Sequence, residues 1–266
     1  MIAVDPLLRR ERALTTACLA ALVLLAWAYI WQGAGMGMTA RDMTALTLFP
    51  HTLGEPMPDM VMPEITWITV VAMWWVMMIA MMTPGAAPLI LLYDRVLKHS
   101  LSRGIAAPGS TLVLIAGYLS VWLVFSAAAA GIQFLLQRAG LISEMMLWSN
   151  SAWLSGLVLI STGVYQLSPL KQACLRNCRS PVRILTRWGR PGRFRAWTMG
   201  FEHGIWCVGC CWLLMALLFV GGVMNVVWIA LISLFVLGEK LFGASPWISR
   251  VSGALLVAWG IATLMV

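Results

Sequence analysis

The chain has 266 residues, of which 61% are hydrophobic and only 11% charged, and its mean hydropathy is +0.87. Soluble domains carry roughly a quarter charged residues, so this composition excludes an ordinary soluble protein and indicates a polytopic helical membrane protein. The net charge of +8 does not call for a nucleic-acid partner, because Lys and Arg in loops set membrane topology. The partner that the composition predicts is the lipid bilayer.

The sequence predicts an all-α fold, with one integral membrane domain over residues 1–266 and about seven transmembrane helices. The spans lie near residues 13–31, 66–92, 110–136, 152–168, 198–221, 223–241 and 247–265. The first span follows Arg9, Arg10 and Arg12, as a signal peptide would. Its apolar run is long enough to cross a bilayer and no clear cleavage site follows it, so we expect a mature helix.

Basic residues concentrate in alternate connections between the spans. They occur in the N-terminal tail, after the second span and, most densely, between Lys171 and Arg195 after the fourth. The connections after the first and third spans are acidic or nearly neutral. Since cytoplasmic loops carry the excess of Lys and Arg, we expect the N-terminus inside and the C-terminus outside a bacterial inner membrane.

The connection after the first span is rich in methionine. Its sequence "EPMPDMVMPE" contains Met57, Met60 and Met62, which we call the outer Met loop. A solvated loop has no core in which methionine would pack, and thioethers are soft ligands that suit Cu(I). The outer Met loop is therefore a candidate copper ligand set, unless the loop lies on the membrane surface.

The second span contains a methionine cluster from Met73 to Met82. Met73, Met77 and Met81 recur every fourth residue and therefore share one helix face. We interpret this face as a candidate Cu(I) path, and ordinary apolar packing is the alternative. Pro84 and Pro88 follow the cluster and predict a break or kink in the helix.

The most distinctive segments are "ACLRNC" and "FEHGIWCVGCCW". Six candidate ligands lie in them: Cys174, Cys178, His203, Cys207, Cys210 and Cys211. The predicted topology places these thiols on the reducing cytoplasmic side, where metal or thiol chemistry is favoured over a structural disulfide. Packing as small buried hydrophobes is the alternative. If the basic loop folds back onto the fifth span, Cys174 and Cys178 complete the ligand set.

Helical spacing divides the ligands of the fifth span into a ladder. His203, Cys207 and Cys210 fall within about 60° on one face, with Cys211 at its edge. Residues four apart can bind one ion, whereas residues seven apart are separated by about 10.5 Å along the axis. We expect His203 and Cys207 to share one position, and Cys207 with Cys210 or Cys211 to form a deeper one. The rise per residue brings the methionine cluster and these cysteines to the same midplane level.

Two acidic residues lie close to the candidate ligands or to the end of a span. Glu202 adjoins His203 but projects about 100° away from it, either as a partner of the site or toward another helix. Glu239 and Lys240 end the sixth span, and we interpret them as an interfacial pair whose lysine extends to the membrane surface.

The segments "AMMTPGAAP", "YQLSPLKQACLRNCRSP", "GFEHGIWCVGCCW" and "GEK" resemble a bacterial family of uncharacterised, predicted metal-binding integral membrane proteins. The resemblance covers roughly residues 70–245, and the Cys/His segment is its most specific part. It implies metal binding, with the six Cys and His residues as candidate ligands. It supplies neither the metal nor a reaction.

The leading hypothesis is a membrane protein that binds or moves Cu(I) from the outer Met loop, through midplane Met and Cys, to a cytoplasmic Cys/His site. A metallochaperone or a periplasmic metal-binding protein would be its partner. Zinc is possible because Cys and His also suit it. Two alternatives stay open: a membrane oxidoreductase or assembly factor with a fixed metal or haem, and a thiol–disulfide enzyme that uses Cys207 and Cys210.

Overall fold

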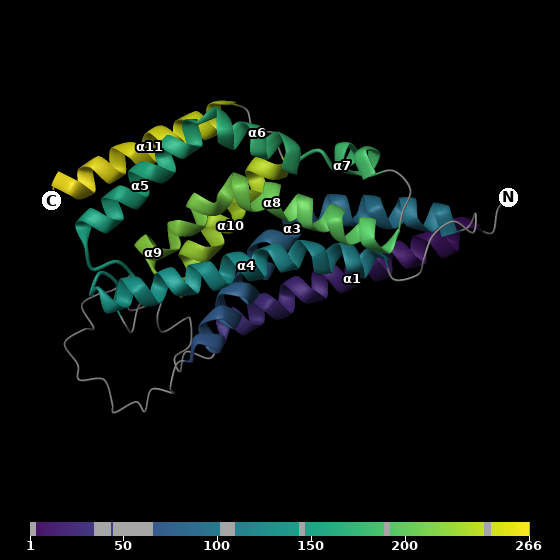
Figure 1. The fold of residues 1–266 in the computed structure, drawn as a ribbon, viewed down its shortest axis with the longest axis horizontal. Coiled ribbons are helices and arrows are strands. Elements are labelled where there is room, and N and C mark those ends of the chain that lie inside the picture. Colours follow the sequence, from purple (N-terminus) through teal and green to yellow (C-terminus); the bar gives the residue numbers. More distant parts are fainter. Residues whose placement is uncertain are drawn as a thin grey trace.

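The computed structural model describes residues 4–34, 44, 66–101, 110–143, 147–188, 192–241 and 246–265. Over this part of the chain the fold is helical, as the composition predicts. The helices are α1 (Val4–Trp31), α3 (Trp67–Leu101), α4 (Ser110–Arg138), α5 (Ala152–Leu167), α6 (Pro169–Cys178), α7 (Pro181–Trp188), α8 (Arg193–Ala216), α9 (Leu218–Gly221), α10 (Val226–Leu241) and α11 (Pro246–Met265). Figure 1 shows that α1 begins at the end of the molecule opposite to the end at which α11 finishes.

Five helical segments among the described residues are long and apolar enough to cross a membrane. They are Ala13–Trp31, Trp67–His99, Thr111–Arg138, Arg193–Gly221 and Trp247–Met265. Helix α5 is apolar but has only 16 residues, and α10 has the same length. A polytopic helical membrane protein is therefore consistent with the structure. The count of seven spans and the orientation of the chain stay predictions.

Helix α3 is continuous across the two prolines that we expected to interrupt it. It extends for 35 residues and contains both Pro84 and Pro88 in its interior. The predicted break is therefore wrong, whereas the alternative of a kink stays a prediction. The physical reason is enclosure: α1, α4 and α10 all pack along α3, and neighbouring helices can sustain a proline-containing helix inside a membrane bundle.

Helices α4 and α8 cross at very short range because each presents a glycine to the backbone of the other. A Cβ atom at Gly200 would lie 1.9 Å from the carbonyl oxygen of Leu114, and one at Gly117 would lie 2.2 Å from that of Trp197. Gly200 and Gly204 form the Gly-x-x-x-Gly spacing that lets helix backbones approach in membranes. This contact sets the next turn of α8 directly against α4.

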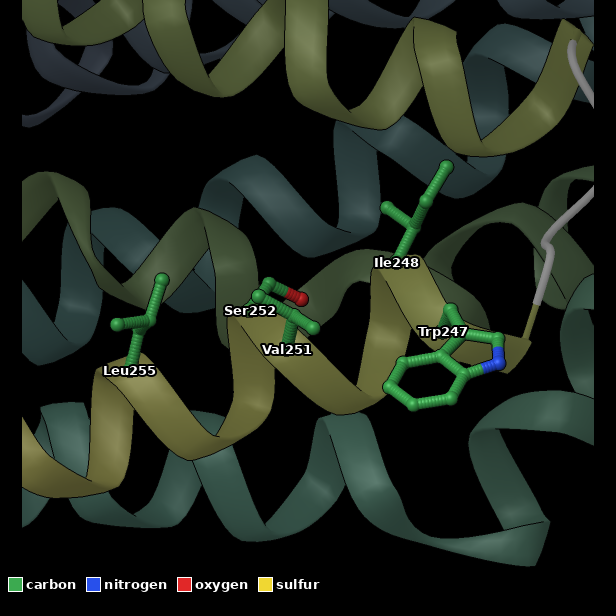
Figure 2. A pocket seen from close by; sticks show the side chains of 5 residues that line it. All are labelled: Trp247, Ile248, Val251, Ser252 and Leu255. Carbon is green, nitrogen blue, oxygen red and sulfur yellow. The ribbon is translucent and has the colours of Figure 1, made fainter.

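Helices α5 and α11 form a second close pair through small residues. Gly163 of α5 faces Gly253 of α11, and Gly156 faces Gly260, so that a Cβ at any of the four would meet the partner helix within 3 Å. Figure 2 shows the other side of α11, where a pocket of about 360 Å³ is lined by Trp247, Ile248, Val251, Ser252 and Leu255. This almost wholly apolar lining suits contact with lipid chains.

A buried ion pair joins α6 to α10. The ammonium group of Lys171 donates to the two carboxylate oxygens of Glu239 at 2.6 and 2.7 Å, and the Ser249 hydroxyl of α11 donates to the same carboxylate at 3.2 Å. The lysine side chain is 0% and the glutamate side chain 3% exposed. The interfacial pairing of Glu239 with Lys240 is therefore wrong, and the Lys171–Glu239 pair anchors α6 inside the bundle.

Candidate metal centre

Cys207 of α8 lies where α3, α4, α8 and α10 converge, and its side chain is fully buried. The ammonium nitrogen of Lys240 lies 2.9 Å from its sulfur, and the Tyr118 hydroxyl lies 3.2 Å from it. Tyr118 is placed there by the close crossing of α4 and α8. It also donates to the carbonyl oxygen of Met82 at 3.1 Å, which joins α4 to α3 at this level. Cys207 is therefore the point at which these helices share polar contacts.

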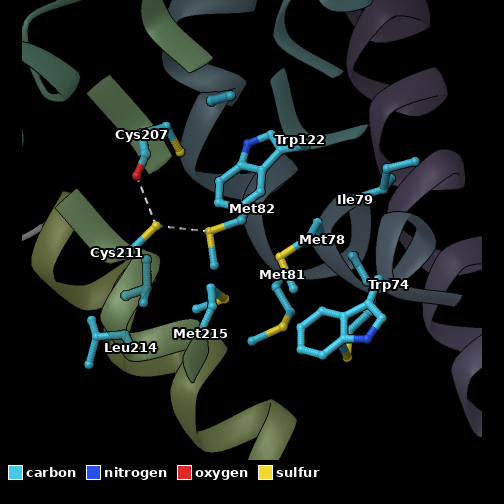
Figure 3. Close-up of a cluster of buried hydrophobic side chains, with 14 of the residues drawn as sticks. Trp74, Met78, Ile79, Met81, Met82, Trp122, Cys207, Cys211, Leu214 and Met215 are labelled. Atoms are coloured by element: carbon cyan, nitrogen blue, oxygen red, sulfur yellow. Dashed lines mark hydrogen bonds between the residues drawn. The ribbon is translucent and has the colours of Figure 1, made fainter. Parts of the chain in front are cut away.

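Two further cysteines of α8 and one methionine of α3 surround Cys207. The thiols of Cys210 and Cys211 donate to the carbonyl oxygen of Cys207 at 3.1 and 2.8 Å. Figure 3 shows the sulfur of Cys211 beside that of Met82, at 3.8 Å. The contact between Cys211 and Met82 brings thiol and thioether sulfur from two different helices into one buried region.

Helix α6 folds back onto α8 and adds two cysteines. The side chain of Cys178 interacts with those of both Cys207 and Cys210. The sulfur of Cys174 would lie 3.2 Å from a Cβ atom at Gly209, so glycine makes room for this thiol. Burial raises the pKa of the Cys174 thiol. The basic segment thus returns to the candidate ligands, which is the arrangement needed for Cys174 and Cys178 to take part.

His203 lies one turn before Cys207 and is only 2% exposed. Within the part of the chain that the structure describes, neither of its ring nitrogens has a hydrogen-bond partner. Its ring centroid lies 5.6 Å from that of Tyr118. His203 also lines a small pocket of about 40 Å³ together with Cys178 and Lys240. A buried imidazole whose ring nitrogens lack partners therefore adjoins this pocket.

The sulfur atoms lie near one another but do not form a complete coordination shell for a metal ion. Among the described residues, no three His, Cys, Asp or Glu side chains are arranged to hold one ion. The thiols of Cys210 and Cys211 are instead directed at a backbone carbonyl. Rotation about χ1 would be needed to turn them toward a common ion. Metal binding by the six Cys and His residues, and sharing of an ion by His203 and Cys207, stay predictions.

The predicted methionine face of α3 is buried in the core. Met73, Met77 and Met81 are at most 2% exposed. It is Met82, outside this face, that contacts Cys211, and Met81 lies further from the cysteines in the view of Figure 3. A ligand role for the predicted face stays a prediction. The outer Met loop, with Met57, Met60 and Met62, lies outside the described residues.

Three residues at the site were not predicted from the sequence as site residues: Lys240, Tyr118 and Met82. Lys240 is only 7% exposed, so its interpretation as an extended interfacial lysine is wrong. A lysine directly after a long apolar segment was the available signal, but the sequence did not indicate which way it turns. No local pattern marks Tyr118. Glu202 faces α7 instead, where Arg187 donates to its carboxylate at 2.9 Å.

The comparison with known protein families supplies an independent finding. The sequence model of a family described as a copper chaperone family, PpoB2, matches residues 71–263. The match contains α4 to α10, nearly all of α3 and α11, and every candidate Cys and His ligand, whereas α1 and the outer Met loop precede it. No curated protein and no solved structure matches the chain. The expected relation to a metal-binding family holds in this form: the chain belongs to the copper chaperone family.

Proposed function

We propose that this protein handles Cu(I) in the bacterial inner membrane, binding the ion at the sulfur site around Cys207 and passing it between the two sides. The family match supports a copper-related role. The chain also carries five helices that are long and apolar enough to cross a membrane. Copper chaperoning within a bilayer, rather than in solution, is the function that combines these two findings.

The single observation that carries the proposal is the grouping of sulfur around Cys207. Cys178 of α6, Cys210 and Cys211 of α8 and Met82 of α3 all reach this region. Soft thiolate and thioether ligands select Cu(I) over hard cations. Zinc fits Cys and His ligands too, but its structural sites use a closed tetrahedral shell, whereas Cu(I) accepts low coordination numbers with sulfur. Copper is therefore favoured and zinc is the alternative.

The proposed route has three stages. The outer Met loop captures Cu(I) from a periplasmic metal-binding protein. The buried methionines of α3 lead toward Met82, where the Cys211 thiol lies 3.8 Å away. The ion then reaches His203 and Cys178 at the basic end of the bundle and passes to a cytoplasmic metallochaperone.

Copper binding by the purified full-length protein tests the proposal. The protein is loaded with Cu(I) under anaerobic reducing conditions, and bound copper is measured by elemental analysis. Cys207→Ser should weaken copper binding by about tenfold or more, since even partners of ligands have effects of that size. Cys18→Ser is the matched control, because Cys18 is an exposed thiol on α1. Equal copper in both variants and in the wild type would place the metal elsewhere.

The same samples separate the alternatives. An optical spectrum with haem bands would favour the oxidoreductase or assembly-factor hypothesis. Protein that binds no copper but forms a disulfide between Cys207 and Cys210 would favour the thiol–disulfide hypothesis.

A further inference from the structure

A small pocket lies next to the sulfur site, where the basic segment with α6 meets the rest of the helices. The pocket, of about 40 Å³, lies between α3, α6, α8 and α10, and Cys178, Arg179, His203, Lys240 and Leu241 are among its lining residues. Cys207 and Met82 are not among the described residues that line it. Cys207 therefore lies beside the pocket rather than in its lining.

His203 gives the pocket a buried imidazole. It is 2% exposed, and within the described structure both of its ring nitrogens lack hydrogen-bond partners. Leaving a buried polar group unpaired is unfavourable, so such a group is a candidate for binding a ligand. The thiol of Cys178 lines the same pocket. An imidazole and a thiol together form a soft donor pair.

Lys240 connects the pocket to the sulfurs around Cys207. Its side chain lines the pocket, while its nitrogen lies 2.9 Å from the sulfur of Cys207 and 3.9 Å from that of Met82. Arg179 donates to the backbone carbonyl of Lys240 at 3.0 Å and so fixes its backbone. A Cβ atom at Gly85 would lie 2.7 Å from Cδ of Lys240, so glycine at this point of α3 makes room for the lysine.

We propose that the pocket is a second, outer position for Cu(I), held by His203 and Cys178, and that the side chain of Lys240 is a gate between it and the inner position at Cys207. This inference rests on the proposed function. Cys178 lines the pocket and also interacts with Cys207, so it can hold the ion in both positions. The ion gains a bond to His203 as it loses its bond to Cys207, and its oxidation state stays +1.

The gate is tested by the rate at which Cu(I)-loaded, full-length protein gives up copper to a water-soluble chromogenic Cu(I) chelator. Lys240→Ala and Lys240→Met both remove the charge, but only alanine removes the bulk of the side chain. Lys240→Ala should release copper about tenfold faster than Lys240→Met, as expected for the opening of a gate. Leu234→Ala is the matched control, since it trims an exposed leucine of α10 that does not line the pocket. It should release copper at the wild-type rate.

The outer position is tested with His203→Ala. This variant should retain the copper content of the wild type at equilibrium and release it about tenfold more slowly, since a transfer ligand affects the rate of passage. Added imidazole should accelerate release from His203→Ala more than from the wild type, which a purely structural role of His203 would not produce. A lower copper content in His203→Ala would assign His203 to the inner ion and overturn the outer position.

The results separate this inference from the proposed function. A wild-type protein that binds no Cu(I) would refute both. Normal copper binding, with equal release rates from Lys240→Ala and Lys240→Met, would refute the gate and leave the copper-handling function intact.

Discussion

The Lys171–Glu239 pair should be one of the most sensitive points of this fold, and Lys171→Met is the change that shows it. The two side chains are 0% and 3% exposed, with nitrogen–oxygen distances of 2.6 and 2.7 Å. Removing the lysine leaves the carboxylate of Glu239 buried, with the Ser249 hydroxyl as its remaining donor in the described structure. Breaking a buried pair by removing one partner costs about 3–5 kcal/mol.

Thermal unfolding of the detergent-solubilised protein measures this effect. A loss of that size should lower the Tm of Lys171→Met by about 10 °C for a chain of this length. Arg187→Met is the matched control, because it breaks the ion pair between Arg187 and Glu202. The Arg187 side chain in this pair is 68% exposed. Such a pair contributes at most about 1 kcal/mol.

A double variant isolates the cause. Lys171→Met combined with Glu239→Leu should recover most of the lost Tm, because a buried pair can be replaced by apolar side chains at little cost. Cys178, at the end of the same helix, should react faster with a thiol reagent in Lys171→Met than in the double variant. A Tm for Lys171→Met equal to that of Arg187→Met would refute the reasoning, since the buried pair would then hold α6 no more firmly than a surface pair does.

Three further outcomes can be measured on the same protein. Met82→Leu should weaken Cu(I) binding by about tenfold in a chelator competition, whereas Met78→Leu, at an equally buried position, should not. Equal Cu(I) affinities of the two variants would show that the thioether of Met82 is not a ligand. Gly200→Ala should prevent accumulation of folded protein, because its Cβ would meet the backbone of α4 at 1.9 Å. Gly238→Ala is the control and should fold, since a Cβ there has open space. A normal Tm for Gly200→Ala would contradict the close crossing of α4 and α8. Changing all three methionines of the outer Met loop to leucine should reduce copper uptake by cells at low copper while the purified protein keeps its full copper content. A reduced copper content would place the principal site in that loop.

The class of protein and the position of the chemistry were available from local sequence. An excess of apolar residues requires helices that satisfy their own backbone hydrogen bonds in a bilayer, and this does not depend on how the helices pack. The soft ligands were visible because they are concentrated in short segments around Cys174 and Cys207. The family match, which covers both segments, agrees with the metal chemistry expected from them.

Depth along the helices could also be calculated, but only approximately. The rise per residue placed the methionines of α3 and the cysteines of α8 at one level. The structure pairs Cys211 with Met82, one turn further along α3 than Met78. Depth follows from counting residues, whereas the choice of the facing side chain depends on how each helix is rotated about its axis.

That rotation was decided by tertiary packing. Gly117 and Gly200 let α4 and α8 approach until Tyr118 reaches Cys207, and no pattern within either helix specifies this partner. The Lys171–Glu239 pair draws α6 into the bundle, and Lys240 turns inward to Cys207 rather than outward to the membrane surface. The sequence by itself determined long apolar helices, of the kind that can cross a membrane, and a set of soft ligands. Only the packing of helices distant in the chain determined which of these ligands meet, because interhelical contacts depend on the facing surfaces of both partners.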